Sequence, residues 1–259
     1  MRKHPMGAFF SRVLLAVPQW HDFFGGTPVD PIRDLDHLLI TAPRLRGDTG
    51  KLVAVMSPNL PAEQVHEAVD LVVHRAGGVW LETEGPVTSA RAKVGGAPRI
   101  FAIIPQKKLL VVLPGDASDQ VERLKQAKPF RNAAEGLVVS LLTPSRPFGA
   151  FFPLPSTLKW MRIALVPTPD GGADVAIDAG DRSPEDAERD ALRMTEEMER
   201  RRKIEVPILG TMEILDAVVF ESKGDVVRAR THVSRSKLSQ IMAFVEGEVK
   251  ARVGDGGAR

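Results

Sequence analysis

Alternation of apolar and polar residues along the chain predicts strands that come in pairs, with each pair followed by a helical pattern. The pattern is clearest in residues 161–166 and 173–179, which alternate on either side of the turn-forming sequence PTPDGG. Ser183 and Pro184 then supply the capping hydroxyl and first-turn proline that are typical of a helix start. This stretch therefore predicts a β-hairpin followed by a helix over 184–203.

The same pattern recurs, less regularly, in the rest of the chain. Further strands are predicted at 37–42, 52–57, 79–83, 89–94, 99–104, 109–113, 137–142, 218–222 and 226–233. Further helices are predicted at 60–76, 117–127 and 235–252, and another within 5–24, where the helix ends near Pro18 and Trp20, Phe23 and Phe24 trail it. Strict alternation of single strands with helices is absent, which disfavours a parallel doubly wound sheet. We therefore predict an α+β fold: a mainly antiparallel sheet built from repeated β-hairpin plus helix units, with helices on one face and two similar halves.

Breaks in this pattern divide the chain into five segments. The predicted segments are an N-terminal helix and aromatic strap (1–36), a first α+β half (37–143), a Pro-rich connector (144–157), a second α+β half (158–252) and a frayed tail (253–259). Within the first half, strands 99–104 and 109–113 are apolar on both faces, so their hairpin is predicted to lie at the centre of the sheet.

Composition limits the class of protein without identifying its function. The 259 residues are 43% apolar and 26% charged, and the 35 basic residues nearly balance the 33 acidic ones, so a polyanion partner such as nucleic acid is not expected. Cysteine is absent, which excludes disulfides, thiolate nucleophiles and thiolate metal sites. The chain lacks a run of about 20 apolar residues, so no membrane span is predicted.

The first residues have some features of a secretory signal, because Arg2 and Lys3 precede an apolar run. Arg12 interrupts that run, and no small-residue cleavage motif follows it. A structural helix is therefore the favoured interpretation of this stretch.

Aromatic residues gather in two glycine- and proline-rich segments, and they are the candidate binding residues. Such aromatics can form an exposed docking patch, or they can fold over the ends of the sheet and complete the core, which is the more common fate of an aromatic side chain. The candidates are Trp20, Phe23, Phe24, Phe148, Phe151, Phe152 and Trp160.

Two groups of possible metal ligands have simpler explanations. His66 and His74 flank Asp70, but eight helical residues separate the two rings by about 12 Å of rise, too far for one metal ion, so a solvated helix face is the favoured interpretation of these three residues. Asp174, Asp178 and Asp181 lack the spacing of a calcium loop, so strand-edge polarity and helix capping explain them better. No metal site and no cofactor is predicted.

The most basic stretch of the chain, 200–203, is a candidate patch for nucleic acid or anionic lipid. Glutamates at 196, 197 and 199 precede the basic residues in the favourable helical order, which predicts a self-paired helix end instead. Phosphate-binding, nucleophile-elbow and zinc-protease motifs are absent from the sequence, so no catalytic residue is predicted.

Three stretches, PQWHDFFGGTPVDPIRDLDHLLITAPRLR, PTPDGGADVAIDAGD and VVRARTHVSRSKLSQIMAFVEG, resemble a group of uncharacterised bacterial proteins from high-GC genomes. Members of that group look like exported or lipid-anchored envelope proteins, for which a signal segment and a further strand are expected ahead of His4. The resemblance implies a cell-envelope location, periplasmic or lipid-anchored, whereas the absence of a clear signal peptide would fit the cytoplasm.

Two functional hypotheses follow. The first is a non-enzymatic envelope-associated domain that binds a protein partner or an apolar ligand, which the aromatic segments and the absence of catalytic motifs favour. The second is a hydrolase or transferase with an unrecognised carboxylate-based site, which predicts ionisable groups that converge in a pocket with perturbed titration.

Overall fold

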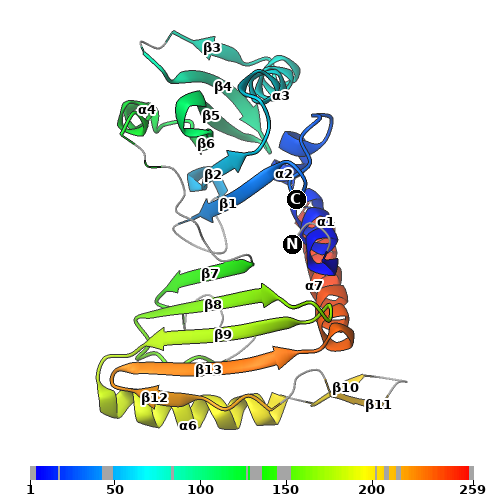
Figure 1. Ribbon diagram of the computed structural model, residues 1–259, viewed down its shortest axis with the longest axis vertical. Coiled ribbons are helices and arrows are strands. Elements are labelled where there is room, and N and C mark those ends of the chain that lie inside the picture. Colours follow the sequence, from blue (N-terminus) through cyan, green and yellow to red (C-terminus); the bar gives the residue numbers. More distant parts are fainter. Residues whose placement is uncertain are drawn as a thin grey trace. The chain divides into compact units, whose positions relative to one another are not determined.

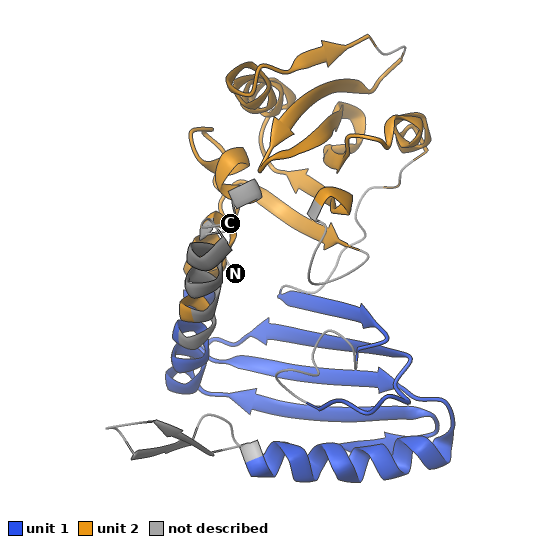
Figure 2. Cartoon of the chain, turned by 180° about the vertical axis from the view of Figure 1, so that it is seen from behind, with its two compact units in different colours: residues 1, 3–6, 134–245 blue, residues 2, 7–133, 246–259 orange. Residues whose placement is uncertain are grey.

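The computed structural model describes residues 4–16, 18–42, 49–82, 85–126, 128, 136–144, 153–201, 203–206, 210–213 and 217–256. The chain divides into two compact units, which Figure 2 shows in different colours. One, the five-stranded unit, comprises residues 1, 3–6 and 134–245, and the other, the six-stranded unit, comprises residues 2, 7–133 and 246–259. Each unit is built around one antiparallel sheet, so the α+β class with mainly antiparallel strands is confirmed.

The six-stranded sheet has the order β1-β2-β6-β5-β4-β3, and all its neighbours are antiparallel (Figure 1). Its strands are β1 (Leu35–Thr41), β2 (Val53–Pro58), β3 (Val79–Leu81), β4 (Thr88–Val94), β5 (Ala97–Ile104) and β6 (Leu109–Pro114). Every residue of the β5 run from Arg99 to Ile104 is buried, as predicted for a hairpin at the centre of the sheet. The β5–β6 hairpin is centrally placed, so this prediction is confirmed.

Helices pack on both faces of this sheet, which corrects the expectation of helices on one face only. On one face, α2 (Pro18–Phe24) and α3 (Ala62–Arg75) bury their apolar side chains against Ala54, Met56 and Phe101. On the other face, α4 (Ser118–Leu124) buries Val121 against Ile100 and its neighbours. The reason is that β5 and β6 are apolar on both faces, so both faces need cover.

The five-stranded sheet has the order β12-β13-β9-β8-β7 and is also antiparallel throughout. Its strands are β7 (Leu137–Leu142), β8 (Trp160–Pro167), β9 (Ala173–Gly180), β12 (Glu221–Lys223) and β13 (Val226–Val233). The sequence analysis placed strand 137–142 in the first half, but β7 pairs with β8 along its whole length. The boundary between the two sheets therefore falls before β7, because this strand pairs forward across the Pro-rich stretch and not back to β6.

The hairpin and helix with the clearest sequence pattern form as predicted. The β8–β9 turn closes with the Thr168 amide donating to the Gly172 carbonyl at 3.1 Å, and Gly171 takes the positive φ of 85° that glycine tolerates. Helix α6 (Pro184–Arg201) begins with the Asp186 amide donating to the Ser183 hydroxyl at 3.2 Å. Its narrow apolar stripe packs against the sheet through Ala187, Ala191, Met194 and Met198.

The remaining elements complete the chain. They are α1 (Pro5–Ala16), α7 (Arg235–Gly256) and the two-stranded ribbon of β10 (Lys203–Val206) and β11 (Gly210–Glu213). The first helix ends near Pro18, as predicted, and the aromatic residues that follow it form a second helix, α2, which was not predicted.

Candidate binding surface

The five-stranded sheet buries one face and leaves the other exposed. Alternate residues of β8, β9 and β13 point towards α6, and Met161, Ala179 and Val227 are the most buried of them. The residues between them form the opposite face, which we call the open face. In register across β7, β8, β9 and β13, its first three rows are Leu142, Trp160, Gly180 and Val226; Ser140, Arg162, Asp178 and Arg228; Val138, Ala164, Ala176 and Arg230. A fourth row, beyond the end of β7, consists of Val166, Asp174 and His232.

The β7 side of the open face is apolar. Leu142 is 82% exposed and Val138 is 48% exposed, although both lie within a strand. Trp160 is paired with Leu142 across the strands and is 36% exposed. Its indole ring lies over Gly180, where a Cβ atom would come within 2.1 Å of the indole Nε1. The glycine therefore makes room for a flat indole surface beside Leu142.

The middle of the open face is charged and has an excess of arginine. Asp178 accepts hydrogen bonds from Arg230 Nη2 at 2.8 and 3.1 Å, and Arg228 Nε lies 3.5 Å from the same carboxylate. Arg162 stands opposite Asp178 in the strand register but makes no ion pair within the described chain. Asp178 therefore pairs with both Arg228 and Arg230. Arg162 is exposed to solvent and lies between these pairs and the apolar β7 side of the open face.

The free edge of β7 borders this surface. Its sequence, LVVSLL, contains no charged residue and no proline, and among the described strands β7 pairs with β8 alone. Edge strands usually carry charges, prolines or bulges, or are short, because an unpaired edge invites another strand. The opposite edge, β12, follows that rule with the exposed residues Glu221 and Lys223. β7 does not, so it is the edge best suited to receive a further strand.

The far end of the open face holds a histidine between two carboxylates. His232 Nδ1 lies 2.9 Å from Asp174 and Nε2 lies 3.1 Å from Asp170, so both ring nitrogens can donate when the ring is protonated. The hydrogen bond to Asp174, followed by the charge of Asp170, raises the pKa of His232. The pKa of Asp170 is lowered, first by the Thr168 hydroxyl and next by the Gly172 amide.

We expect Asp174→Asn to lower the pKa of His232, because an amide no longer favours the imidazolium. The raised pKa means that this cluster stabilises the fold fully below the unfolded histidine value of about 6.5, and that the contribution disappears as pH rises through the folded value. NMR titration of the His232 ring measures the change, and Asp119→Asn on α4 is the control. An unchanged titration curve in Asp174→Asn would show that the hydrogen bond does not govern the ring.

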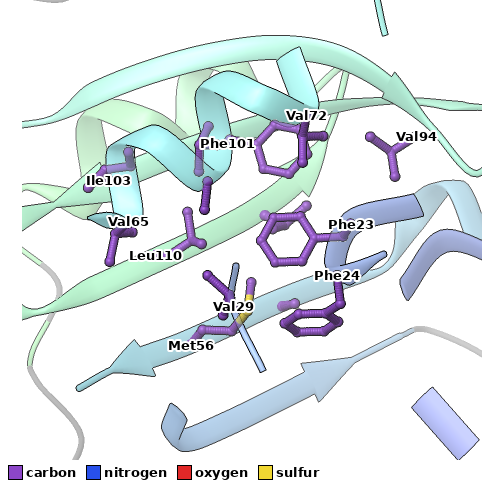
Figure 3. Packing of buried hydrophobic residues seen from close by; sticks show 14 of the residues in the cluster. Phe23, Phe24, Val29, Met56, Val65, Val72, Val94, Phe101, Ile103 and Leu110 are labelled. Carbon is purple, nitrogen blue, oxygen red and sulfur yellow. The ribbon is translucent and has the colours of Figure 1, made fainter. Parts of the chain in front are cut away.

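The candidate aromatics of the first strap are buried in the six-stranded unit. Trp20, Phe23 and Phe24 are 6%, 2% and 4% exposed, and Phe23 stacks on Phe101 with ring centroids 5.8 Å apart (Figure 3). The cavity beside Trp20 and Phe23 holds only about 20 Å³, roughly the space of one water molecule. Their placement agrees with the interpretation that the strap completes a core, and the cavity has no room for an apolar ligand.

The other candidate aromatics are separated from these three. Trp160 lies on the open face of the five-stranded sheet. Phe148, Phe151 and Phe152 fall outside the residues that the structure describes. Of the seven candidates, Trp160 is thus the one that the described chain places on an accessible surface.

Sequence reasoning missed a contact at the α3 surface. His66 stacks on Trp80 of β3 at a centroid distance of 4.3 Å, and the Trp80 indole donates to Asp70 at 2.7 Å. The two polar residues therefore tie β3 to α3, where a plain solvated helix face was predicted for them. The four-residue spacing of His66 and Asp70 places both on one helix face, but nothing in the sequence indicated that Trp80 would cover it.

The remaining polar clusters are mostly engaged in pairs. Asp174 and Asp178 contact His232 and the arginines of β13, whereas Asp181 is buried at the end of β9. Arg200 pairs with Glu197 at 2.9 Å and with Glu196 at 3.5 Å, as predicted for a self-paired helix end. The side chains of residues 201–203 lie outside the described part of the chain.

No known protein family, no curated protein and no solved structure matches this chain. Among the described helices, none has the length and apolar character needed to cross a bilayer. The resemblance to envelope proteins stays a prediction, and function has to be argued from the surfaces described above.

Proposed function

We propose that the protein is a non-enzymatic, envelope-associated binding module that takes up an extended segment of a partner protein along β7. The observation that carries this proposal is a charge-free edge strand whose exposed side chains, Val138 and Leu142, continue into the exposed Trp160. An added strand would hydrogen-bond to the free edge through its main chain, which supplies affinity without sequence preference.

The open face specifies the side chains that such a segment should carry. Residues at every second position of an added strand would lie beside Val138 and Leu142, where apolar side chains bury most area. Arg162, which has no carboxylate partner in the described chain, stands in the next strand of the same face. An added segment therefore fits best when, among the residues on the open face, apolar ones lie beside Val138 and Leu142 and an acidic one lies between them, beside Ser140 and near Arg162.

The test uses a fluorescein-labelled synthetic peptide with valine, glutamate and valine at every second position and threonine between them, and the same peptide with lysine in place of glutamate is the charge control. We expect the full chain to bind the acidic peptide, and Leu142→Lys to weaken binding by at least about tenfold because it places a charge on the edge. Leu192→Lys is the matched control, since Leu192 is 65% exposed on α6. Arg162→Gln should weaken binding of the acidic peptide alone.

Three results would overturn this proposal. They are absence of binding by the unaltered chain, equal binding by Leu142→Lys, and self-association through β7. In the last case light scattering would detect a dimer in the unaltered chain and a monomer in Leu142→Lys. The strand that pairs with β7 would then come from a second copy of the chain.

The envelope location rests on the resemblance of the three sequence stretches to exported bacterial proteins. Fractionation of the native cell with an antibody against the chain tests it independently of peptide binding. Recovery of the protein from the cytoplasmic fraction alone would remove the envelope location but leave the binding proposal standing.

We also infer that β1–β2–α3, β5–β6–α4, β8–β9–α6 and β12–β13–α7 are copies of one hairpin-helix unit. The support is that each consists of two adjacent antiparallel strands followed by a helix. The proposal of two similar halves has weaker support, since the sheets differ in strand number and order.

The alternative of a carboxylate-based hydrolase or transferase has one supporting feature. Asp181 and Asp190 face each other, and the pKa of Asp181 is raised, first by burial. Both residues are buried, at 0% and 2% exposure, and neither lines either hollow found among the described residues. A substrate would have no access to them, so we favour binding over catalysis.

A further inference from the structure

The five-stranded unit contains a pair of buried carboxyl groups that the proposed binding surface does not use. Asp181 directly follows β9 and is 0% exposed, and Asp190 lies in α6 and is 2% exposed. Carboxylates are among the side chains least often fully buried, because an ion loses its hydration in the interior. Two of them side by side need a specific compensation.

Asp190 has donors, but Asp181 is only half satisfied. The Thr157 hydroxyl donates to Asp190 Oδ2, and Arg189 Nε lies 3.5 Å from Oδ1. Asp181 Oδ1 accepts the Arg182 amide at 2.8 Å, whereas Asp181 Oδ2 is buried and receives no hydrogen bond. The group that faces Asp181 is the carboxyl of Asp190, which as an ion can only accept.

One added proton resolves this arrangement. A proton on Oδ2 of Asp181 converts the unpartnered acceptor into a donor towards Asp190, and a single negative charge then remains between the two groups. We propose that Asp181 and Asp190 hold one proton between them. The shared proton forms a pH-sensitive link, which holds together the end of β9, helix α6 and the segment 153–158.

Further contacts hold together the segments that this link joins. Thr157 belongs to the segment that leads into β8, and the next residue, Leu158, is 2% exposed in the core of the unit. Lys159 then donates its amide to the Gly180 carbonyl at 2.8 Å, and Asp181 donates its amide to the Asp225 carbonyl at 2.7 Å. Charging both carboxyls would therefore strain the point where three parts of the chain meet.

The charged groups around the pair do not neutralise a second negative charge. Helix α6 contributes Asp186, whose charge also disfavours ionisation of Asp181. It also contributes Arg189, whose single positive charge is shared among Asp186, Asp190 and, more weakly, Asp181. The exposed Arg182 directs its guanidinium to the Ser156 carbonyl at 3.4 Å. The contributions of the segment 153–158 and the β12–β13 turn are the Thr157 hydroxyl and the Asp225 carbonyl.

The direction of the pH dependence follows from these contacts. Burial and the neighbouring Asp190 raise the pKa of Asp181 above the unfolded value of about 3.9. Between those two values the folded chain binds more protons than the unfolded chain, so stability falls as pH rises. The pair thus opposes the usual behaviour of an ion-paired aspartate, which stabilises at higher pH.

The test compares the thermal midpoint of the full chain with that of Asp181→Asn in a pH series that starts near the unfolded aspartate value of about 3.9 and continues to alkaline pH. The asparagine amide reproduces both hydrogen bonds of the protonated carboxyl, accepting from Arg182 and donating to Asp190, at every pH. We expect the midpoint of the unaltered chain to fall with rising pH, and that of Asp181→Asn to fall less and to be higher at the alkaline end. Glu188→Gln, an exposed position on α6, is the matched control.

A second measurement does not depend on any variant. Carboxyl carbon NMR of the unaltered chain should show that one carboxyl of the pair loses its proton at a pH above the unfolded aspartate value of about 3.9. Loss of both protons at or below that pH, or parallel midpoint curves for Asp181→Asn and the unaltered chain, would overturn the proposal. So would a rise in the midpoint caused by added calcium in the unaltered chain but not in Asp181→Asn, because a cation would then replace the proton.

Discussion

Replacing Phe23 by alanine is expected to destabilise the six-stranded unit by about 3–5 kcal/mol, which is the usual cost of removing a buried phenyl ring. Phe23 is 2% exposed, stacks on Phe101 and meets Phe24 edge to face at a centroid distance of 4.8 Å. Its loss would leave a void between α2 and the centre of the sheet, and the backbone of β5 cannot collapse into it because β5 is paired on both sides.

Urea unfolding followed by tryptophan fluorescence measures this effect. In a Trp160→Phe background the remaining tryptophans, Trp20 and Trp80, both belong to the six-stranded unit and report on it alone. Leu71→Ala is the control, since Leu71 is 43% exposed on α3 and its loss should change stability by no more than about 0.5 kcal/mol. Equal, small effects of the two substitutions would mean that Phe23 packs loosely and that the strap could still serve as a docking surface.

Elements with strong local patterns could be predicted from sequence. The β8–β9 hairpin and the start of α6 depend on residues within a few positions of each other, namely the PTPDGG turn and the Ser183 cap. The central place of β5 and β6 also follows locally, because strands that are apolar on both faces must be covered on both. The helix on the second face, α4, is the other consequence of that pattern, which the expectation of one covered face overlooked.

Strand β7 shows where local pattern stops being informative. Alternation predicted a strand at 137–142, and the structure has one with those bounds. Adjacent strands in sequence usually pair, but β7 has the end of the first sheet before it and a long Pro-rich stretch after it. The strand with which β7 pairs depends on which sheet has a matching free edge. The residues of β7 alone therefore do not predict its partner.

The open face and the Asp181–Asp190 pair also differ in how far they could be predicted from the sequence. The open face is a repeat of alternate residues, so Trp160 and the β13 arginines could have been assigned to one face once the register was known. The pair of Asp181 and Asp190 gave no such signal, because one residue follows a strand and the other lies in a helix. Motifs of fixed spacing identify residues that act together within one helix, strand or loop. Asp181 and Asp190 are brought together only by the packing of α6 against the end of β9.

Replacing Met194 by alanine is expected to destabilise the five-stranded unit by about 2–5 kcal/mol. Helix α6 attaches to the sheet through a narrow stripe in which Ala187 and Ala191 are small, so Met194, at 2% exposure, is the largest fully buried side chain of that stripe. Fluorescence of Trp160 in a background without Trp20 and Trp80 reports on this unit. Leu192→Ala, two residues away and 65% exposed, removes a similar volume from the same helix at the same helix propensity. If the two substitutions had the same effect, the apolar stripe would not be what holds α6 on the sheet. The polar contacts around Asp190 and Thr195 would then have to hold the helix. One of these contacts is the hydrogen bond that the Thr195 hydroxyl accepts from the Phe220 amide at 2.9 Å.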